Sequence, residues 1–314
     1  MREARSVDIS VVIPVSQHSG DLEEIYTRFS SELEKTGQLY EFIFIDDGIG
    51  EKSFQILKHI QEQHANVKVI KFNQTFGEAV ALSVGFEKAR GEIIITLASF
   101  MQTDPQDIHK LLHEIEVGYD LVIGWRYHRV DPVLNRWQSI AFNWITRRLT
   151  KVPLHDLNCS LRVLRRKVVE AIPVYGDQFR FLPILANRQG FRVKEVRVRH
   201  MEEMGETGIY GLGSYVRRMI DIFTLFFLVK FTKKPLRFFG LIGSALFGVG
   251  LSINLYLTVI RLMGNAIGDR PLLLLGVLLM VLGIQTFAIG LVGEIIIFTH
   301  AKKIKEYNIE QFLE

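Results

Sequence analysis

Residues 41–48 read EFIFIDDG, a short apolar run that ends in two aspartates and a glycine. A run of this length that is closed by a turn signal is typical of a strand buried on both faces. Similar runs lie on both sides of it, and each is separated from the next by a stretch with helical periodicity. The five expected strands are Ile9–Pro14, Glu41–Asp46, Val67–Phe72, Glu92–Ala98 and Tyr119–Trp125. The expected helices between them are Asp21–Lys35, Lys52–His64, Gly77–Ala89 and Pro105–Val117.

This alternation of strands and helices predicts the fold class α/β, with a parallel-type sheet covered by helices on both faces. Ligands of such sheets bind at the carboxyl ends of the strands. The rule points to Pro14 after the first strand, to Asp46, Asp47 and Gly48 after the second, and to Arg126 after the fifth. The sequence has no GxGxxG after the first strand and no GxxxxGK[ST], which excludes a Rossmann dinucleotide site and a P-loop.

Two polar segments are candidates for chemistry. A carboxylate in the Asp-Asp-Gly segment can accept hydrogen bonds from an amide edge or a ribose diol, and glycine lets a ligand approach the backbone. The same residues also suit an ordinary strand-ending turn. Further along, Asp156 precedes Arg162 and the basic run Arg165-Arg166-Lys167. Asp156 is therefore a candidate general base beside an anion site, and a surface salt bridge with a helix cap is the alternative.

The composition narrows the class of protein. The chain has 314 residues and a formal net charge of +4, which is too small to indicate nucleic-acid binding. Apolar residues make up 48% and charged residues 23%, so the chain is not disordered throughout. Cys159 is the only cysteine, which excludes an internal disulfide and a cysteine-based metal cluster.

Two uncharged runs near the end of the chain, Phe238–Ile260 and Pro271–Gly293, are each long enough to cross a bilayer as a helix. A pair of buried helices in a soluble domain is the alternative. The excess of basic residues outside the two runs places the N-terminal part and the C-terminus in the cytoplasm, at the plasma or inner membrane if the source is bacterial. The basic residues are Lys230, Lys233, Lys234, Arg237, Lys302, Lys303 and Lys305.

Small residues form a stripe along each predicted span, which indicates close packing against the other span or against a second subunit. The stripes are Gly240, Ser244, Gly248 and Ser252, and then Gly276, Gly283 and Gly290. Residues 133–149 and 214–229 combine apolar and basic residues in a way that suits helices lying on an anionic membrane surface, or else helices packed in the core. We therefore expect a cytoplasmic domain over 1–212, a juxtamembrane segment over 213–237, two spans over 238–299 and a cytoplasmic tail over 300–314.

Several motifs together resemble one family. They are VVIPV at 11–15, IDDG at 45–48, FGEAVALSVGFEKARGEII at 76–94, GYDLVIGWR at 118–126, LRVLRRKVV at 161–169 and GLVGEI at 290–295. With these motifs the chain resembles the family 2 glycosyltransferases of GT-A fold, and among them the membrane-anchored polyisoprenyl-phosphate glycosyltransferases similar to dolichol-phosphate mannose synthase. The resemblance implies transfer of a sugar from a nucleotide-diphosphate sugar to a polyprenyl phosphate at the cytoplasmic face of the membrane. It also implies a possible homo-oligomer.

The resemblance implies roles for individual residues. Asp156 and Arg162 fall at the positions expected to be catalytic. The nucleotide sugar is expected to contact Pro14, Asp46, Asp47, Gly48, Gly77 and Arg126.

The metal site is where the chain departs from the family pattern. Mg²⁺ or Mn²⁺ is expected to bind an Asp-x-Asp motif, whose positions are Ala98 and Phe100 here. Neither residue offers the oxygen ligands that these ions need. Asp104 and Asp107 are the nearby substitutes, and Arg126, Arg162, Arg165 and Arg166 are candidates to bind a diphosphate without a metal. Two hypotheses follow: a divergent glycosyltransferase, or an inactive relative that serves as a scaffold or binding subunit in a glycan pathway.

Overall fold

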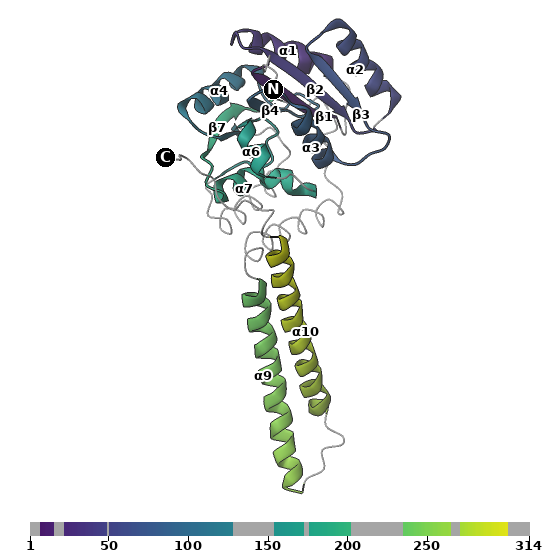
Figure 1. Cartoon of the computed structure of the whole chain (residues 1–314), viewed down its shortest axis with the longest axis vertical. Helices are drawn as coiled ribbons and strands as arrows, with labels where there is room; N and C mark the ends of the chain where they lie inside the picture. The colour runs from purple at the N-terminus through teal and green to yellow at the C-terminus, as the bar shows by residue number, and fades with distance from the viewer. Residues whose placement is uncertain are drawn as a thin grey trace. The chain divides into compact units, whose positions relative to one another are not determined.

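The computed structural model describes residues 7–15, 22–48, 50–127, 154–172, 176–201, 235–264 and 271–300 (Figure 1). These residues form two compact units, one before residue 222 and one that contains the two long C-terminal helices. The predicted interfacial segment 133–149, most of the juxtamembrane segment 213–237 and the tail after His300 lie outside the described residues.

The first unit begins with alternating strands and helices, close to the predicted bounds. They are β1 (Ile9–Val15), α1 (Leu22–Glu34), β2 (Tyr40–Asp46), α2 (Glu51–Gln63), β3 (Val67–Lys71), α3 (Glu78–Lys88), β4 (Ile93–Thr96), the 3-10 helix η1 (Pro105–Asp107), α4 (Ile108–Val117) and β5 (Leu121–Tyr127). After residue 153 follow β6 (Arg162–Arg165), α6 (Arg166–Ala171), the 3-10 helix η2 (Gly176–Phe181), α7 (Leu182–Arg188) and β7 (Val193–Arg199).

The seven strands form one sheet in the order β3-β2-β1-β4-β6-β5-β7. The predicted α/β fold is confirmed, with one addition that alternation did not predict: β6 pairs antiparallel with both β4 and β5. Because β6 is antiparallel to both of its neighbours, β4 and β5 run in the same direction as each other. β5 therefore has the same direction as β1, β2, β3 and β4. The carboxyl ends of these strands therefore lie at one edge of the sheet, where ligands of such folds bind.

Burial shows that the centre of the sheet is covered on both faces. All seven residues of β1 are buried. Because neighbouring side chains of a strand point to opposite faces, both faces of the sheet are covered at β1. Helix α1 contributes an apolar stripe at helical spacing, which includes Leu22, Ile25, Phe29 and Leu33. Apolar burial from both sides is the main contribution to the stability of this unit.

A buried carboxylate anchors the opposite, amino edge of the sheet. Glu41 of β2 accepts a hydrogen bond from Ser10 Oγ (2.7 Å) and one from the backbone N–H of Arg90 (2.8 Å), and it pairs with Lys68 (2.7 Å). Burial raises the pKa of Glu41, but the hydrogen bonds from Lys68, Ser10 and Arg90 outweigh it, and the net effect is a lowered pKa. The Glu41 carboxylate thus ties the turn between α3 and β4 to the sheet.

Glu41→Gln should lower the stability of the protein by about 2 kcal/mol near neutral pH, because charged hydrogen bonds are lost. A lowered folded-state pKa contributes stability above the unfolded value of about 4.3, and this contribution is lost as the pH falls through the folded value. The difference in thermal midpoint between wild type and variant should therefore shrink between about pH 5 and pH 3. A difference that stayed constant over this range would contradict the assignment.

The second unit consists of α9 (Pro235–Leu262) and α10 (Pro271–His300), which lie side by side as two long helices in Figure 1. Both are long and apolar enough to cross a membrane, as predicted. Their contact is made at glycines: a Cβ atom at Gly243 would lie 2.6 Å from the carbonyl oxygen of Gly283, and one at Gly250 would lie 2.6 Å from that of Gly276. At one end of the pair, Glu294 of α10 accepts the backbone N–H of Leu236 in the first turn of α9 (3.3 Å).

The contact face of α9 differs from the predicted stripe. Gly240 lies near Phe287 of α10, but Ser244, Gly248 and Ser252 are exposed, and a Cβ atom at Gly248 would meet nothing within 4 Å. On α10 the predicted residues Gly276, Gly283 and Gly290 all approach α9. Gly243 and Gly250 of α9 are seven residues apart, as are the three glycines of α10. A spacing of seven residues keeps one face of a helix toward its partner, so these glycines mark the contact between α9 and α10.

Candidate active site

Most of the residues that the sequence predicts for nucleotide-sugar binding lie at the carboxyl edge of the sheet. Asp46 is the last residue of β2 and is opposite Val15 of β1, and Pro14 is opposite Ile45. Asp46 and Asp47 are both buried. Gly77 is the residue before α3 and has a φ of +96°, a value that favours glycine. Parallel pairing of β1 with β2 brings Pro14 and Asp46 together, and hydrogen bonds to Asp47 bring Gly77 beside them.

Asp47 and Gly48 hold the loop that leads into α3. The carboxylate of Asp47 accepts the backbone N–H of Phe76 (2.7 Å) and that of Gly77 (2.9 Å). Gly48 has a φ of +72°, and a Cβ atom there would lie 2.8 Å from the carbonyl carbon of Gln74. The close approach that glycine allows here is therefore to the protein's own loop, whose residues 73–76 are exposed beside the strand ends.

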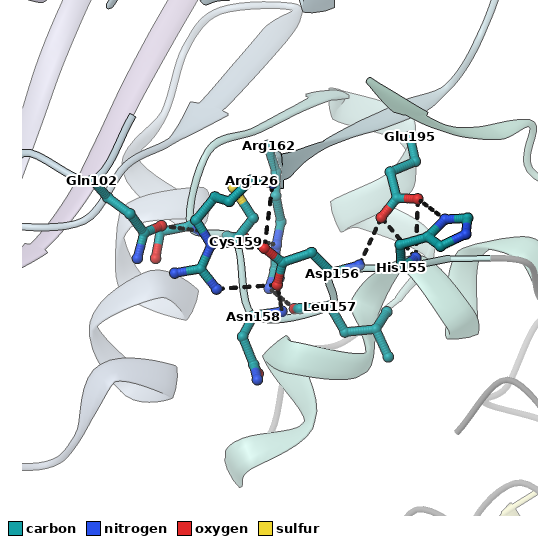
Figure 2. A network of polar contacts seen from close by, with 10 residues as sticks. Gln102, Arg126, His155, Asp156, Leu157, Asn158, Cys159, Arg162 and Glu195 are labelled. Carbon is teal, nitrogen blue, oxygen red and sulfur yellow. Dashed lines mark hydrogen bonds and ion pairs between the residues drawn. The ribbon is translucent and has the colours of Figure 1, made fainter. Parts of the chain in front are cut away.

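The second group of predicted residues centres on a buried ion pair (Figure 2). Arg126 of β5 donates through Nε to one oxygen of Asp156 (2.7 Å) and through Nη2 to the other (3.1 Å). The side chains of Arg126 and Asp156 are only 5% and 2% exposed. The backbone N–H of Asn158 also donates to Asp156 (3.2 Å). Asp156 is thus a charge-balanced, oriented carboxylate rather than a surface salt bridge.

Glu195 of β7 holds the chain just before Asp156. Its carboxylate accepts the backbone N–H groups of His155 (2.8 Å) and Asp156 (2.7 Å), and it pairs with Nδ1 of the His155 ring (2.8 Å). The His155 ring stacks on Trp125 of β5, with ring centroids 4.3 Å apart. Burial raises the pKa of Glu195, and the hydrogen bonds from Asp156 and His155 oppose that rise.

Arg162 holds the other end of the same loop. Its guanidinium donates to the carbonyl oxygens of Cys159 (3.0 Å), Leu157 (2.9 Å) and Phe179 (2.6 Å), and burial lowers its pKa. Burial also raises the pKa of the Cys159 thiol to about 12, so this cysteine is a packing residue. The loop formed by residues 154–161 is fixed at both ends by these contacts.

The loop is also tied to the segment that follows β4. Gln102 accepts the backbone N–H of Ser160 (3.0 Å), and Thr96 of β4 donates its hydroxyl to the carbonyl oxygen of Ser160 (2.7 Å). The structure therefore brings Arg126, Asp156 and Arg162 together with the segment that carries Ala98 and Phe100. Arg165 and Arg166 are used differently, because both donate to carbonyl oxygens at the ends of α4 and α3.

The residues that are described do not fit the divalent metal that the family pattern implies. Ala98 and Phe100 have no oxygen ligand in their side chains. Asp104 caps η1 through Gln106 N (3.1 Å) and pairs with Arg199, and Asp107 accepts the backbone N–H of Arg199 (2.6 Å). Over the described ranges, no three His, Cys, Asp or Glu side chains are grouped so that they could hold a metal ion.

Comparison with known proteins identifies the family. The model of the family described as "Glycosyl transferase family 2" matches residues 10–172, which extend from β1 through α6. The chain belongs to glycosyl transferase family 2. The match contains both groups of residues at the carboxyl edge of the sheet.

Relatives within glycosyl transferase family 2 match along almost the whole chain. An undecaprenyl-phosphate 4-deoxy-4-formamido-L-arabinose transferase of Pseudomonas aeruginosa is 33% identical over 91% of this chain and 84% of its own length. The Shewanella sediminis transferase of the same name is 32% identical over 100% of this chain and 95% of its own length. A dodecaprenyl-phosphate galacturonate synthase of Rhizobium johnstonii is 28% identical, with coverages of 94% and 89%.

A solved structure supports the GT-A fold. Glucosyl-3-phosphoglycerate synthase of Mycobacterium tuberculosis, crystallised with Mn²⁺, uridine diphosphate and phosphoglyceric acid, has a TM-score of 0.53 to this chain. The structural match covers 71% of this chain and 78% of the synthase chain, at 16% sequence identity. At this identity the likeness concerns the fold alone.

Proposed function

We propose that the protein transfers a sugar from a nucleotide-diphosphate sugar to the phosphate of a polyprenyl lipid at the cytoplasmic face of the membrane. The observation that carries the proposal is the whole-chain similarity to polyprenyl-phosphate sugar transferases, which extends through α9 and α10. A lipid acceptor also accounts for the two apolar helices, since an anchored enzyme meets its acceptor at a high local concentration.

In the proposed reaction an oxygen of the lipid phosphate attacks the anomeric carbon of the donor sugar. The bond between that carbon and the donor phosphate oxygen breaks, and its electron pair leaves with the nucleoside diphosphate. Pro14, Asp46, Asp47, Gly48 and Gly77 are proposed to form the nucleotide side of the site, on the strand ends and the loop that Asp47 holds.

Asp156 is proposed as the acidic catalytic residue, and Arg126 orients its carboxylate through two hydrogen bonds. Arg162 is proposed to support catalysis by fixing the loop through its three carbonyl contacts. Both side chains are held in place by these contacts, so they need no reorganisation when charge develops in the reaction.

The membrane arrangement is part of the proposal. The basic residues outside the two spans support a cytoplasmic N-terminal unit and a cytoplasmic C-terminus. A homo-oligomer is supported by Ser244, Gly248 and Ser252, which are exposed on α9 and would let a second helix approach closely. Mass measurement of the detergent-solubilised protein, before and after Gly248→Leu, tests whether copies associate through this stripe.

The test of function is transfer into lipid. Purified protein in vesicles with undecaprenyl phosphate is given radiolabelled UDP-glucose, UDP-galacturonate, UDP-4-deoxy-4-formamido-L-arabinose or GDP-mannose, and label is measured in the lipid extract. Transfer from at least one donor is the expected result. No transfer from any of them, together with no calorimetric binding of UDP or GDP, would favour an inactive scaffold. The observation that favours this second function is the absence of acidic residues at positions 98 and 100.

Transfer should not depend on a divalent ion. Because positions 98 and 100 lack ligand oxygens and Asp104 and Asp107 are engaged by the chain itself, we expect the rate in excess EDTA to stay within about twofold of the rate in Mg²⁺. A family member with an intact Asp-x-Asp motif, assayed in parallel, should lose its activity in EDTA. A loss that Mn²⁺ restores in this protein would show that other acids replace the motif.

A further inference from the structure

We infer that Glu195 is a positioning residue for the transfer reaction. By holding the backbone of His155 and Asp156, Glu195 fixes Asp156 beside Arg126 of β5. This inference rests on the proposed function, since it presumes that Asp156 acts in transfer. Neither the sequence motifs nor the family resemblance assigns a role to Glu195.

The Glu195 carboxylate makes four contacts to one short segment. One Glu195 oxygen accepts the N–H groups of both His155 and Asp156, at 2.8 and 2.7 Å. The other oxygen accepts the His155 N–H at 2.9 Å and lies 2.8 Å from Nδ1 of the ring. Figure 2 shows the carboxylate directed at this segment from β7. Two consecutive backbone N–H groups and one ring are thereby fixed at a single point.

Glu195 lies within a paired strand of the sheet. Residues 193–199 of β7 pair in parallel with all of β5, and Glu195 is opposite Ile123. Arg126 lies on the same β5 strand, so the two groups that hold the segment, Glu195 and Arg126, are at fixed positions on neighbouring strands. Sites that are held by strands are more precise than sites that are held by loops.

The position of the Asp156 backbone in turn determines where the Asp156 carboxylate lies. The N–H of Asp156 is bound to Glu195, and its side chain meets Arg126 at 2.7 and 3.1 Å. A bidentate pair requires both oxygens to match the guanidinium fork, so a small shift of the backbone breaks one of the two bonds. The Glu195 side chain is only 7% exposed, and burial of a carboxylate is costly unless donors compensate for it.

Glu41 offers a matched control for Glu195. It is also a buried glutamate on a strand, it also accepts a backbone N–H, and it also meets a side-chain donor on a nearby segment. Its contacts lie at the amino edge of the sheet, away from Asp156. Glu41→Gln should therefore lower stability without changing the turnover of the folded protein.

The experiment compares Glu195→Gln with Glu41→Gln in the lipid-transfer assay, on full-length protein in vesicles with undecaprenyl phosphate and whichever tested donor wild type uses. A glutamine has one acceptor oxygen and one NH2 group where glutamate has two acceptor oxygens. The NH2 group replaces an oxygen that accepts from His155, so the hydrogen bonds of that oxygen are lost. We expect kcat to fall about 100-fold in Glu195→Gln, because small misplacements of a reacting group have effects of that size. The KM for the donor should stay within about twofold, since the loop at Asp47 is untouched. Equal turnover in Glu195→Gln and Glu41→Gln would overturn the inference. If Glu195→Gln does not fold, Glu195→Asp is measured in its place with the same expectation.

A double-mutant cycle tests the route through Asp156. If Glu195 acts through the Asp156–Arg126 pair, the losses of Glu195→Gln and Arg126→Lys should be less than multiplicative when combined, because both disturb one interaction. Fully multiplicative losses would show that Glu195 acts by another route. Failure of the proposed function is distinguishable from either result, since wild-type protein itself would then transfer no sugar.

Discussion

Asp156→Ala should abolish measurable transfer and destabilise the N-terminal unit by about 3–5 kcal/mol, the usual result of removing one partner of a buried ion pair. The Arg126 side chain is only 5% exposed, so its charge cannot move into water when the carboxylate is removed. The backbone N–H of Asn158 also loses its acceptor. Thermal unfolding of the detergent-solubilised protein, followed by tryptophan fluorescence, measures the change in stability, and the lipid-transfer assay measures the change in rate.

A second variant separates stability from catalysis at this site. Replacing both partners, as Arg126→Met with Asp156→Leu, removes the buried charge, and such exchanges are often neutral or stabilising. We expect the double variant to regain most of the thermal stability that Asp156→Ala loses while transfer stays absent. Transfer in the double variant would refute a catalytic role for Asp156. Stability as low as that of Asp156→Ala would mean that packing, rather than the loss of the ion pair, decides the effect.

The strand and helix pattern was predictable because its signals are local. Strands β1, β2, β4 and β5 are mainly apolar runs, β3 alternates apolar residues with lysine, and turn residues such as Gly48 and Gly118 stand at the boundaries of the elements. The antiparallel strand β6 was not predictable in this way. Its four residues, Arg162–Arg165, include two arginines, and their pairing with β4 depends on a connection that returns from beyond β5.

Sequence reasoning could name candidate site residues, whose roles stay predictions, but not the contacts that these residues make. The strand-end rule located Asp46, Asp47 and Arg126, and the family resemblance added Asp156 and Arg162. Neither source indicated that Asp47 binds the loop before α3, or that Arg162 donates to three carbonyl oxygens. The contacts of Asp47 with Gly77 and of Arg162 with Phe179 join residues far apart in the chain, so sequence spacing does not predict them.

Glu195 illustrates the same limit. In the sequence it is one charged residue in VKEVRVR, a strand-like alternation in which an acidic side chain suggests a solvent-facing position. Its burial arises because the loop that carries His155 folds back over β7. A buried carboxylate with several donors is an unusual environment, and it is visible only when the partners are in place.

The glycine contact between α9 and α10 carries the second large expected effect. Gly283→Leu should lower the thermal midpoint of the full-length protein in detergent by several degrees and reduce its yield in membranes. A Cβ atom at Gly283 would lie 2.6 Å from the backbone nitrogen of Phe247 and 2.7 Å from the carbonyl oxygen of Gly243, so the two helices must separate to make room. We place the cost at the upper end of the about 1–3 kcal/mol that is typical of overpacking, because the atoms in the way are backbone. In a bilayer, packing lost between helices is not regained by apolar burial elsewhere. Ala288→Leu on the same helix is the control, since Ala288 is exposed, and its midpoint should match that of wild type. Equal effects of the two substitutions would show that the loss comes from the larger side chain itself and not from the contact between α9 and α10.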